Sequence, residues 1–331
     1  MTSALRSLAL AVVLGALAYG HGQAEIVVPA GETQTIPPGL QRITRLELRS
    51  GSTLVVSGTT TILVDRLITE PGATVQFIPA RDVYDTDVAL TINALDASGL
   101  QELRVVGNGR DGSGYEVGDR APAGASGRDA LDCGHSLRYP AGREATSGGR
   151  GGTGQAGQHG THALDVLLYL PNVPPGGHVV IEANGGKGGR GQGGGNGGRG
   201  GNSSNCHDGR NGGPGGPGGR GGDGGDGGNV FVFLIVPDDV YSDVAKRDER
   251  IQSIRFDITN NSGSRGSGGD GGDGGNPGRG ALIGPGRRTS GDPGTDGPDG
   301  ADGAPARSQI EAMSQSAYLQ FIAQQMRSFG D

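Results

Sequence analysis

The sequence predicts an all-β protein. A region of short strands, solenoid-like or sandwich-like, precedes β-hairpins and a polyglycine-II bundle, and an amphipathic helix closes the chain. Short β-type runs between glycine turns predict the first part, and a recurring strand-loop-strand unit predicts the hairpins. The bundle follows from glycine triplets that keep their phase, since 70 of the 331 residues are glycine and aromatic residues make up only 4%. Side-chain burial alone therefore does not order the glycine-rich half.

Residues 1–24 read as a signal peptide. Arg6 supplies a positive start, and Ser7 to Ala18 is an apolar run too short to cross a bilayer. Cleavage sites fall after Ala18 and after Ala24. We therefore expect an exported protein, located in the periplasm, on the outer surface or outside the cell. No later segment has the roughly 20 apolar residues of a membrane helix.

Residues 25–106 form the predicted β-rich domain. Alternating runs such as Ile43–Leu48 and Thr61–Leu67 are typical of half-buried strands, and Ser50-Gly51 and Ser57-Gly58 supply turns. Residues 107–147 have no such pattern and are expected to form an irregular loop.

A strand-loop-strand unit that ends in asparagine and glycine occurs three times, at residues 88–109, 164–186 and 229–260. Such a repeat predicts an array of hairpins whose apolar strands are buried against their neighbours. Three unrelated hairpins are the alternative.

Residues 148–305 hold the triplets, including GGKGGRGQGGGNGGRGGN from Gly185 and GGPGGPGGRGGDGGDGGN from Gly212. A period of three is that of polyproline II, which makes no internal hydrogen bonds, so N–H and C=O groups must pair between chains. The short connection between these two tracts predicts that they run antiparallel. A disordered linker and a trimeric collagen-like helix are the alternatives. The third residue of each triplet is expected on a solvent-facing row, which comprises Arg150, Lys187, Arg190, Arg199, Arg220, Asp223, Asp226, Asp270 and Asp273.

The sequence pattern of residues 306–331 predicts an amphipathic helix. Ser308 and Glu311 form a capping box, and Ile310, Met313 and Phe321 lie near helical spacing. The helix is expected to dock on the body, or alternatively to bind a partner.

The alternation of hairpins and GGX tracts from Gly148 to Pro305 resembles polyglycine-II bundle proteins. These include the tip adhesins of T-even-like phage tail fibres, the snow-flea antifreeze proteins and bacterial collagen-like surface proteins. In the phage adhesins the loops that join the glycine strands contact the host receptor. A signal peptide does not suit a phage tail, and charged third positions do not suit an ice-binding face. Bacterial exported proteins are therefore the better comparison.

Cys133 and Cys206 are the two cysteines of the chain. Because export places them in an oxidising compartment, we expect them to form a disulfide. Zinc binding with His135 and His207 is the alternative. Aspartates three residues apart on one strand are about 9 Å apart, too far to share one calcium ion.

No catalytic, cofactor-binding or metal site is predicted. Asp82, Asp85 and Asp87 cluster in one segment, which raises the alternative of a polysaccharide-active β-solenoid. The net charge of −7 argues against a nucleic-acid partner. The sequence therefore predicts a non-catalytic structural or adhesive surface protein. Its loops, such as residues 110–146 and 238–252, are expected to contact an extracellular polysaccharide or protein, and ice binding is a further alternative.

Overall fold

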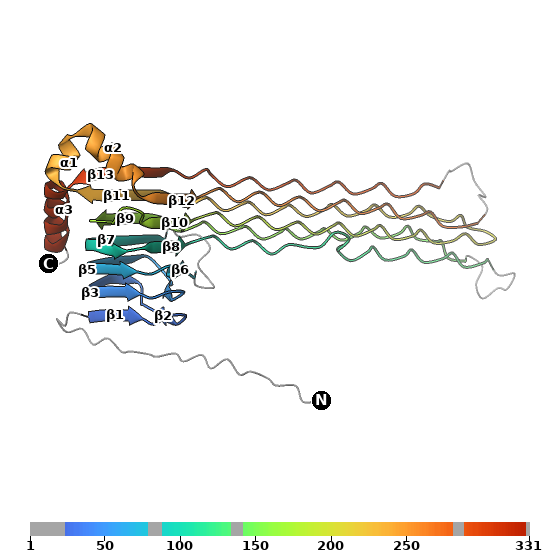
Figure 1. Ribbon diagram of the computed structural model, residues 1–331. Helices are drawn as coiled ribbons and strands as arrows, with labels where there is room; N and C mark the ends of the chain where they lie inside the picture. The colour runs from blue at the N-terminus through green and yellow to red at the C-terminus, as the bar shows by residue number, and fades with distance from the viewer. Residues whose placement is uncertain (1–23, 79–87, 134–141, 281–287, 329–331) are drawn as a thin grey trace, which may run out of the picture.

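A computed structural model describes residues 24–78, 88–133, 142–280 and 288–328. A body of two sheets carries a long rod of extended chain (Figure 1). Sheet A has the order β1-β3-β5-β7-β9-β11-β13, and sheet B has the order β12-β10-β8-β6-β4-β2. Every pairing within the two sheets is parallel. The strands are β1 (Ala24–Val28), β2 (Thr33–Thr35), β3 (Gly39–Leu48), β4 (Thr53–Val56), β5 (Thr60–Thr69), β6 (Thr74–Phe77), β7 (Ala89–Leu100), β8 (Glu102–Val106), β9 (Asp165–Pro171), β10 (His178–Glu182), β11 (Val230–Val236), β12 (Arg255–Thr259) and β13 (Ser308–Ser314).

Consecutive strands alternate between the two sheets. The chain turns from β3 into β4 at Gly51, whose φ of 66° favours glycine. Each strand then pairs with the strand two places further along the chain, as Leu46 of β3 does with Leu67 of β5. Parallel pairing follows because every second strand runs in the same direction.

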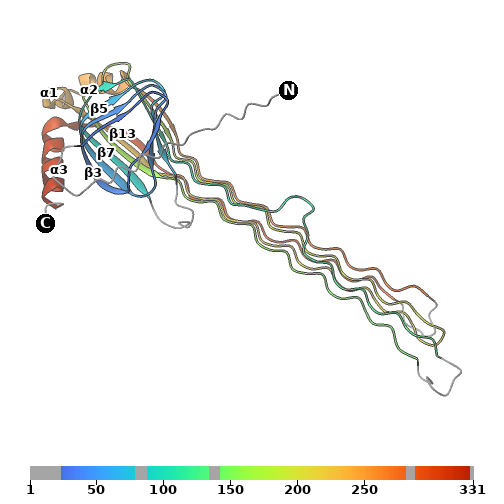
Figure 2. The same cartoon turned by 90° about the horizontal axis from the view of Figure 1, so that it is seen from below.

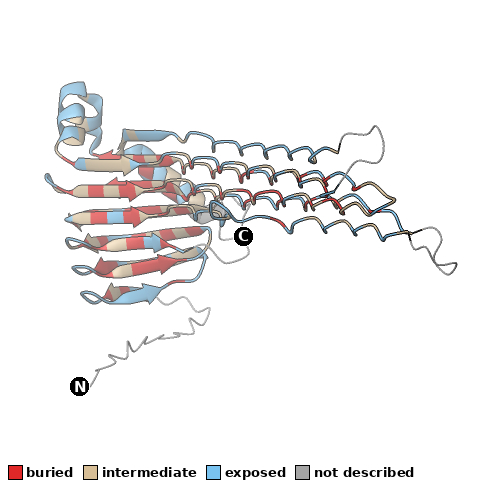
Figure 3. Ribbon diagram, turned by 90° about the vertical axis from the view of Figure 1, so that its right-hand side faces the viewer, coloured by how far each residue is buried: buried red, intermediate tan, exposed pale blue. Residues whose placement is uncertain are grey.

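The hydrophobic core lies between the two sheets. Alternate residues of each strand point inward, as Ile62 and Val64 do in β5 and Val230 and Val232 do in β11, and all four are almost fully buried. Figure 3 shows this burial repeating from strand to strand along the body. One contiguous cluster runs from Ile26 to Ile254.

Three helices lie near the β13 end of the body: α1 (Asp238–Ser242), α2 (Val244–Gln252) and α3 (Gln315–Ser328). Asp243 caps α2 by accepting from the N–H groups of Ala245 and Lys246. Helix α3 packs on sheet A through Tyr318, which is 2% exposed and donates to the Ala94 carbonyl at 2.6 Å. The ring of Tyr169 stacks on both Tyr318 and Phe321.

The rod consists of six extended tracts with neither helix nor regular strand. Odd-numbered tracts leave the C-terminal ends of sheet B strands, and even-numbered tracts return to the starts of sheet A strands. The six lie side by side along the rod in both views (Figures 1 and 2). They are tract 1 (107–131, after β8), tract 2 (145–164, before β9), tract 3 (183–203, after β10), tract 4 (210–229, before β11), tract 5 (260–280, after β12) and tract 6 (288–307, before β13).

The predicted fold class is wrong. We expected an all-β chain with a separate short-strand region, followed by hairpins and a polyglycine-II bundle. The structure instead has parallel sheets of seven and six strands with a few helices. Purely parallel sheets are otherwise typical of α/β proteins. The expected hairpins fail because their two strands belong to different sheets: β9 lies in sheet A and β10 in sheet B.

Three local predictions need correction as well. Ser308 and Glu311, expected to cap a helix, lie in β13, and the helix begins at Gln315. The contact loop expected at residues 238–252 is occupied by α1 and α2. Much of the expected irregular loop at 107–147 is tract 1. Outside the described residues lie positions 1–23 of the predicted signal peptide, together with Asp82, Asp85, Asp87 and His135.

Candidate functional site: the glycine rod and its tip

Hydrogen bonds between tracts repeat every three residues. At the first position of each triplet, here called a, the N–H binds a carbonyl of the next tract that runs in the same direction, as Gly185 does with Asn261 at 2.8 Å. At position b the N–H binds the preceding, antiparallel tract, as Gly186 does with Thr161 at 3.0 Å. The antiparallel pairing expected for residues 185–202 and 212–229 is present, for example from Gly225 N–H to Gly186 O at 2.8 Å.

Close approach of neighbouring backbones explains the glycines. A Cβ on Gly185 (position a) would lie 2.0 Å from the Gly225 carbonyl oxygen of the following tract. A Cβ on Gly186 (position b) would lie 2.0 Å from the Arg110 oxygen, two tracts earlier. Position a therefore favours glycine where a following tract exists, and position b where a tract two places earlier exists. Arg265 at position a of tract 5 and Gln192 at position b of tract 3 are exceptions.

This rule accounts for the composition of tracts 2, 3, 4 and 6, with few exceptions. Tracts 3 and 4 have neighbours on both sides and read mostly GGX, whereas tract 6 has no following tract and reads GDPGTDGPDGADGAP from Gly291. Tract 2 has no tract two places before it and carries Gln155, Gln158 and Thr161 at position b. The number of glycines per triplet is thus higher in tracts inside the rod than in tracts at its edges.

At position c the N–H is frequently bound by a side chain. Asp, Asn and His side chains of one tract accept these N–H groups from the next tract in the same direction, at 2.6–3.0 Å in the pairs given below. The polar row is therefore part of the hydrogen-bond lattice as well as exposed. The pairs, acceptor first, are Asp111–Lys187, Asp129–Asn202, Asn196–Asp273, His159–Asp223, His162–Asp226, Asp223–Ala301 and Asp226–Ala304.

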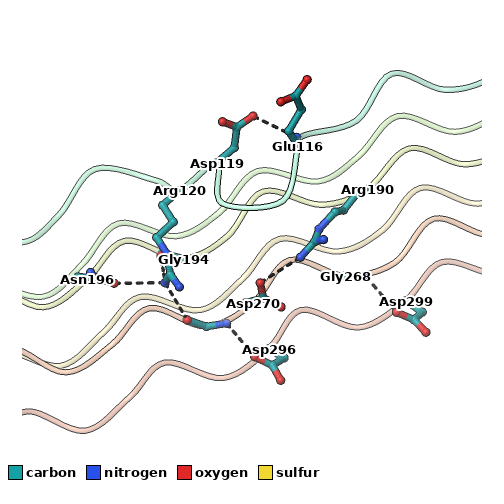
Figure 4. Close-up of polar contacts among 11 residues, drawn as sticks. Glu116, Asp119, Arg120, Arg190, Gly194, Asn196, Gly268, Asp270, Asp296 and Asp299 are labelled. Carbon is teal, nitrogen blue, oxygen red and sulfur yellow. Dashed lines mark hydrogen bonds and ion pairs between the residues drawn. The ribbon is translucent and has the colours of Figure 1, made fainter.

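A bulge interrupts tract 1 at residues 116–119. The register to tract 3 changes there, because Tyr115 N–H binds Arg190 O whereas Ala121 N–H binds Gly193 O. The loop stands out from the rod in Figure 2. Arg120 follows it and reaches across tract 3, donating to Asn196 Oδ1 at 3.2 Å and to Gly271 O of tract 5 at 3.1 Å (Figure 4). This guanidinium therefore connects three tracts where the backbone pairing is interrupted.

The tip of the rod, here residues 131–133, 142–144 and 203–210, is cross-linked. Cys133 and Cys206 form a disulfide with a Cα separation of 5.9 Å, joining the end of tract 1 to the turn between tracts 3 and 4. Asn205 accepts the Cys133 N–H through Oδ1 at 2.9 Å, and its own N–H binds Asp132 at 3.0 Å. Leu131 is 53% exposed beside this turn.

His207 Nε2 lies 4.0 Å from Cys133 Sγ. Among the described residues, Cys133, Cys206 and His207 are the only group of three with the spacing of metal ligands. The sulfurs are joined to each other, and disulfide sulfur is a poor substitute for the thiolate that zinc prefers. The arrangement therefore favours a covalent cross-link over a zinc site.

Charge on the rod is paired locally. The N–H and side chain of Asn202, helped by the nearby Arg199, hold the pKa of Asp129 below its usual range. Asp270 forms an ion pair with Arg190 at 3.0 Å (Figure 4), and Asp223 forms one with Arg220 at 2.6 Å.

The nine predicted outer positions are exposed or half-buried, and none is buried. The structure brings Arg190 and Asp270 together across tracts 3 and 5, while Arg150 and Lys187 lie exposed. Sequence reasoning missed the capping role of His159 and His162. The spacing of three residues between the two histidines could have revealed this role, because Asp223 and Asp226 of tract 4 have the same spacing.

A small apolar pocket of about 130 Å³ lies at the other end of the body. Its lining includes Leu95, Pro171, Ile235 and Tyr318 from β7, β9, β11 and α3. The lining also includes the polar side chains of Asn172 and Gln315, and none of the described residues that line it is charged.

Comparison with protein-family models, with curated proteins and with solved structures finds no match. Among the described residues, no helix has the length and apolar character needed to cross a membrane.

Proposed function

We propose that this chain is an exported, non-catalytic surface protein in which the body anchors a stiff arm and the tip makes contact with an extracellular polymer. The observation that carries the proposal is the rod itself. Six tracts extend in one direction from the body and end at a turn that a disulfide holds in place.

Stiffness of the arm is supported by the hydrogen bonding. Within tracts 3 and 4 most glycine N–H groups pair with another tract at 2.7–3.2 Å, so bending breaks several bonds at once. An extended segment of 18 residues spans about 60 Å. Such an arm places the tip well away from the sheets.

We assign the contact to the tip because its turns lie outside the regular hydrogen bonding between tracts, and binding residues are common in such surface loops. Leu131 and Asn205 are exposed there, and the disulfide limits the entropy lost when a partner binds. Neutral or basic polysaccharides and proteins suit the acidic chain, whose net charge is −7. The same charge disfavours nucleic acid.

Two experiments test the proposal. The full chain is expressed in a bacterial host, and the mass of its mature N-terminus is measured; a product starting after Ala18 or Ala24 supports export, and retention of Met1 in the cytoplasm contradicts it. The purified protein is then applied to immobilised polysaccharides and matrix proteins. Leu131→Ser/Asn205→Ala at the tip should reduce binding at least tenfold.

The matched control for binding is Val244→Ser, which changes a residue 58% exposed on α2 of the body. This variant should bind like the wild type. Equal binding by all three proteins would place the contact elsewhere than the tip.

A further inference from the structure

The last tract of the rod differs from the inner tracts at position a. In tracts 3 and 4 this position is glycine along the rod, at residues 185–200 and 212–227 in steps of three. By the same register, position a of tract 6 has no glycine. After Ser290 at the tip, its residues towards the body are Pro293, Asp296, Asp299, Asp302 and Pro305.

Side chains at these positions exclude a further tract. At the matching positions of tract 4, an added Cβ would meet backbone oxygens of tract 5. A Cβ on Gly215 would lie 1.9 Å from the Gly272 oxygen, and a Cβ on Gly218 would lie 1.9 Å from the Gly269 oxygen. Asp296 and Asp299 carry such a Cβ, so a chain that packed on tract 6 as tract 5 packs on tract 4 would meet the same close contacts.

Several donors of this edge are also occupied or missing. Three outward N–H groups of tract 5 bind carboxylates of tract 6: Arg265 binds Asp302 at 2.9 Å, Gly268 binds Asp299 at 3.0 Å and Gly271 binds Asp296 at 2.8 Å. Figure 4 shows the Asp296 and Asp299 contacts. Pro277, Pro293 and Pro305 have no N–H at the corresponding positions.

An edge of unpaired backbone groups is a template for another chain, and proteins block such edges with proline, charge or a covering element. A second copy of this chain is the molecule that would add to an open edge. The rod of that copy is already extended, so it would lose little conformational entropy on packing. At the other edge, Pro122 lacks an N–H, Thr161 Oγ1 accepts the Arg110 N–H at 2.6 Å, and the 116–119 bulge breaks the register.

We propose that Pro293, Asp296, Asp299, Asp302 and Pro305 form a closing row that keeps the rods of neighbouring copies from adding side by side. The row has two parts, since the side chains block close approach and the carboxylates occupy the donors of tract 5. The protein therefore presents its tip as a separate arm, and contact between copies through the rod is excluded.

The test is the molar mass of the full chain in solution, measured by sedimentation and light scattering at rising concentration. The wild type should remain at the mass of one chain. Replacing the closing row with glycine in one variant should at least double the weight-average mass. Asp292→Gly/Pro298→Gly is the matched control, because it removes the same residue types from the same tract at position c, and it should stay at the mass of one chain.

Circular dichroism of each variant checks the fold. If the five-residue variant does not fold, Asp296→Gly/Asp299→Gly/Asp302→Gly, which clears three consecutive triplets and frees the three tract 5 donors, is measured instead and should also associate. A folded opened variant that stays at the mass of one chain, or a control that associates equally, overturns the proposal. Association of the wild type that the rod edge mediates overturns it as well.

Discussion

Gly219→Ala tests the idea that close approach between backbones sets the glycine pattern. Gly219 is at position b of tract 4, and a Cβ there would lie 1.9 Å from the Gln155 oxygen of tract 2. Ordinary contact begins at 3.4 Å, so that oxygen must retreat by about 1.5 Å, from 3.4 − 1.9. The same oxygen accepts the Gln192 N–H at 2.8 Å, and a shift of this size breaks the bond.

The magnitude follows from the bonds that are lost. Moving this part of tract 2 also strains the bond from Gly154 N–H to Pro217 O, now 2.9 Å. Each buried donor left unpaired costs about 1–3 kcal/mol, so two lost bonds cost about 2–6 kcal/mol. We expect Gly219→Ala to lower the free energy of unfolding by about 4 kcal/mol.

Gly152→Ala is the matched control. Gly152 is at position b of tract 2, where no tract lies two places earlier, and its Cβ would be 3.1 Å from Pro122 O of the edge tract. A shift of a few tenths of an ångström relieves this contact, and alanine removes about 0.4–1 kcal/mol of unfolded-chain entropy. We expect a change within about 1 kcal/mol.

The assay is urea unfolding followed by far-ultraviolet circular dichroism with the disulfide intact. Equal midpoints for Gly219→Ala and Gly152→Ala would refute the reasoning, because the two variants differ in the number of neighbouring tracts and not in the residue changed. A large loss for both would refute it too.

Further predictions concern the caps, the cross-link and α3. Reducing the Cys133–Cys206 disulfide, which closes a separation of 73 residues, should lower the thermal midpoint, with a stability loss of about 2–4 kcal/mol; no change in calorimetry would contradict the assigned cross-link. His159→Ala should cost about 1 kcal/mol in urea unfolding by leaving the Asp223 N–H unpaired, and a cost equal to that of His159→Asn would contradict this. The folded pKa of Asp129 is lowered, so its stabilisation is present above the unfolded pKa of about 3.9 and is lost as the pH falls through the folded value. Unfolding midpoints at pH 7 and pH 3 should therefore differ less in Asp129→Asn than in the wild type. Tyr318→Ala should cost about 3–5 kcal/mol in urea unfolding because the ring is buried, and Tyr318→Phe about 1 kcal/mol.

Sequence reasoning located the short strands and the triplets but not how they are connected. Val179 to Glu182 and Leu164 to Leu170 have the apolar texture of strands, and both form strands. Nearness in sequence suggested hairpins, whereas His178 in β10 pairs with Glu102 of β8, 76 residues earlier, and with Arg255 of β12. Local pattern does not encode such long-range parallel pairing.

The spacing of glycines in tract 1 already indicates a tract of the rod, although an irregular loop was expected there. Tract 1 was expected to be irregular because Gly109, Gly112, Gly124 and Gly127 are separated by polar residues. Their spacing in threes is the position-a pattern of an edge tract, which needs one glycine per triplet. The two glycine pairs keep the same phase, but Tyr115 and Ala121 replace glycine between them and the bulge at 116–119 interrupts the pairing, so the repeat is hidden.

At Ser308 the tertiary structure overrode a local signal. The S-x-x-E pattern favours a helix start, yet tract 6 delivers this segment in register to the open edge of β11, where Val230 pairs with Ser308 and Val236 with Ser314. Seven residues of strand pairing compensate for the lost first turns of a helix, which begins one residue later at Gln315.

The body and the rod depend on each other through the register of the sheets. β8 pairs with β10, and the same alignment continues into the rod, where Gly107 N–H binds Glu182 O and Gly109 N–H binds Asn184 O at 2.7 Å each. At this boundary the hydrogen-bond period changes from two residues to three. Ordering glycine is entropically costly, so free tracts have little reason to align. The sheets bring their ends together at strand spacing, and each added triplet then extends contacts already in place.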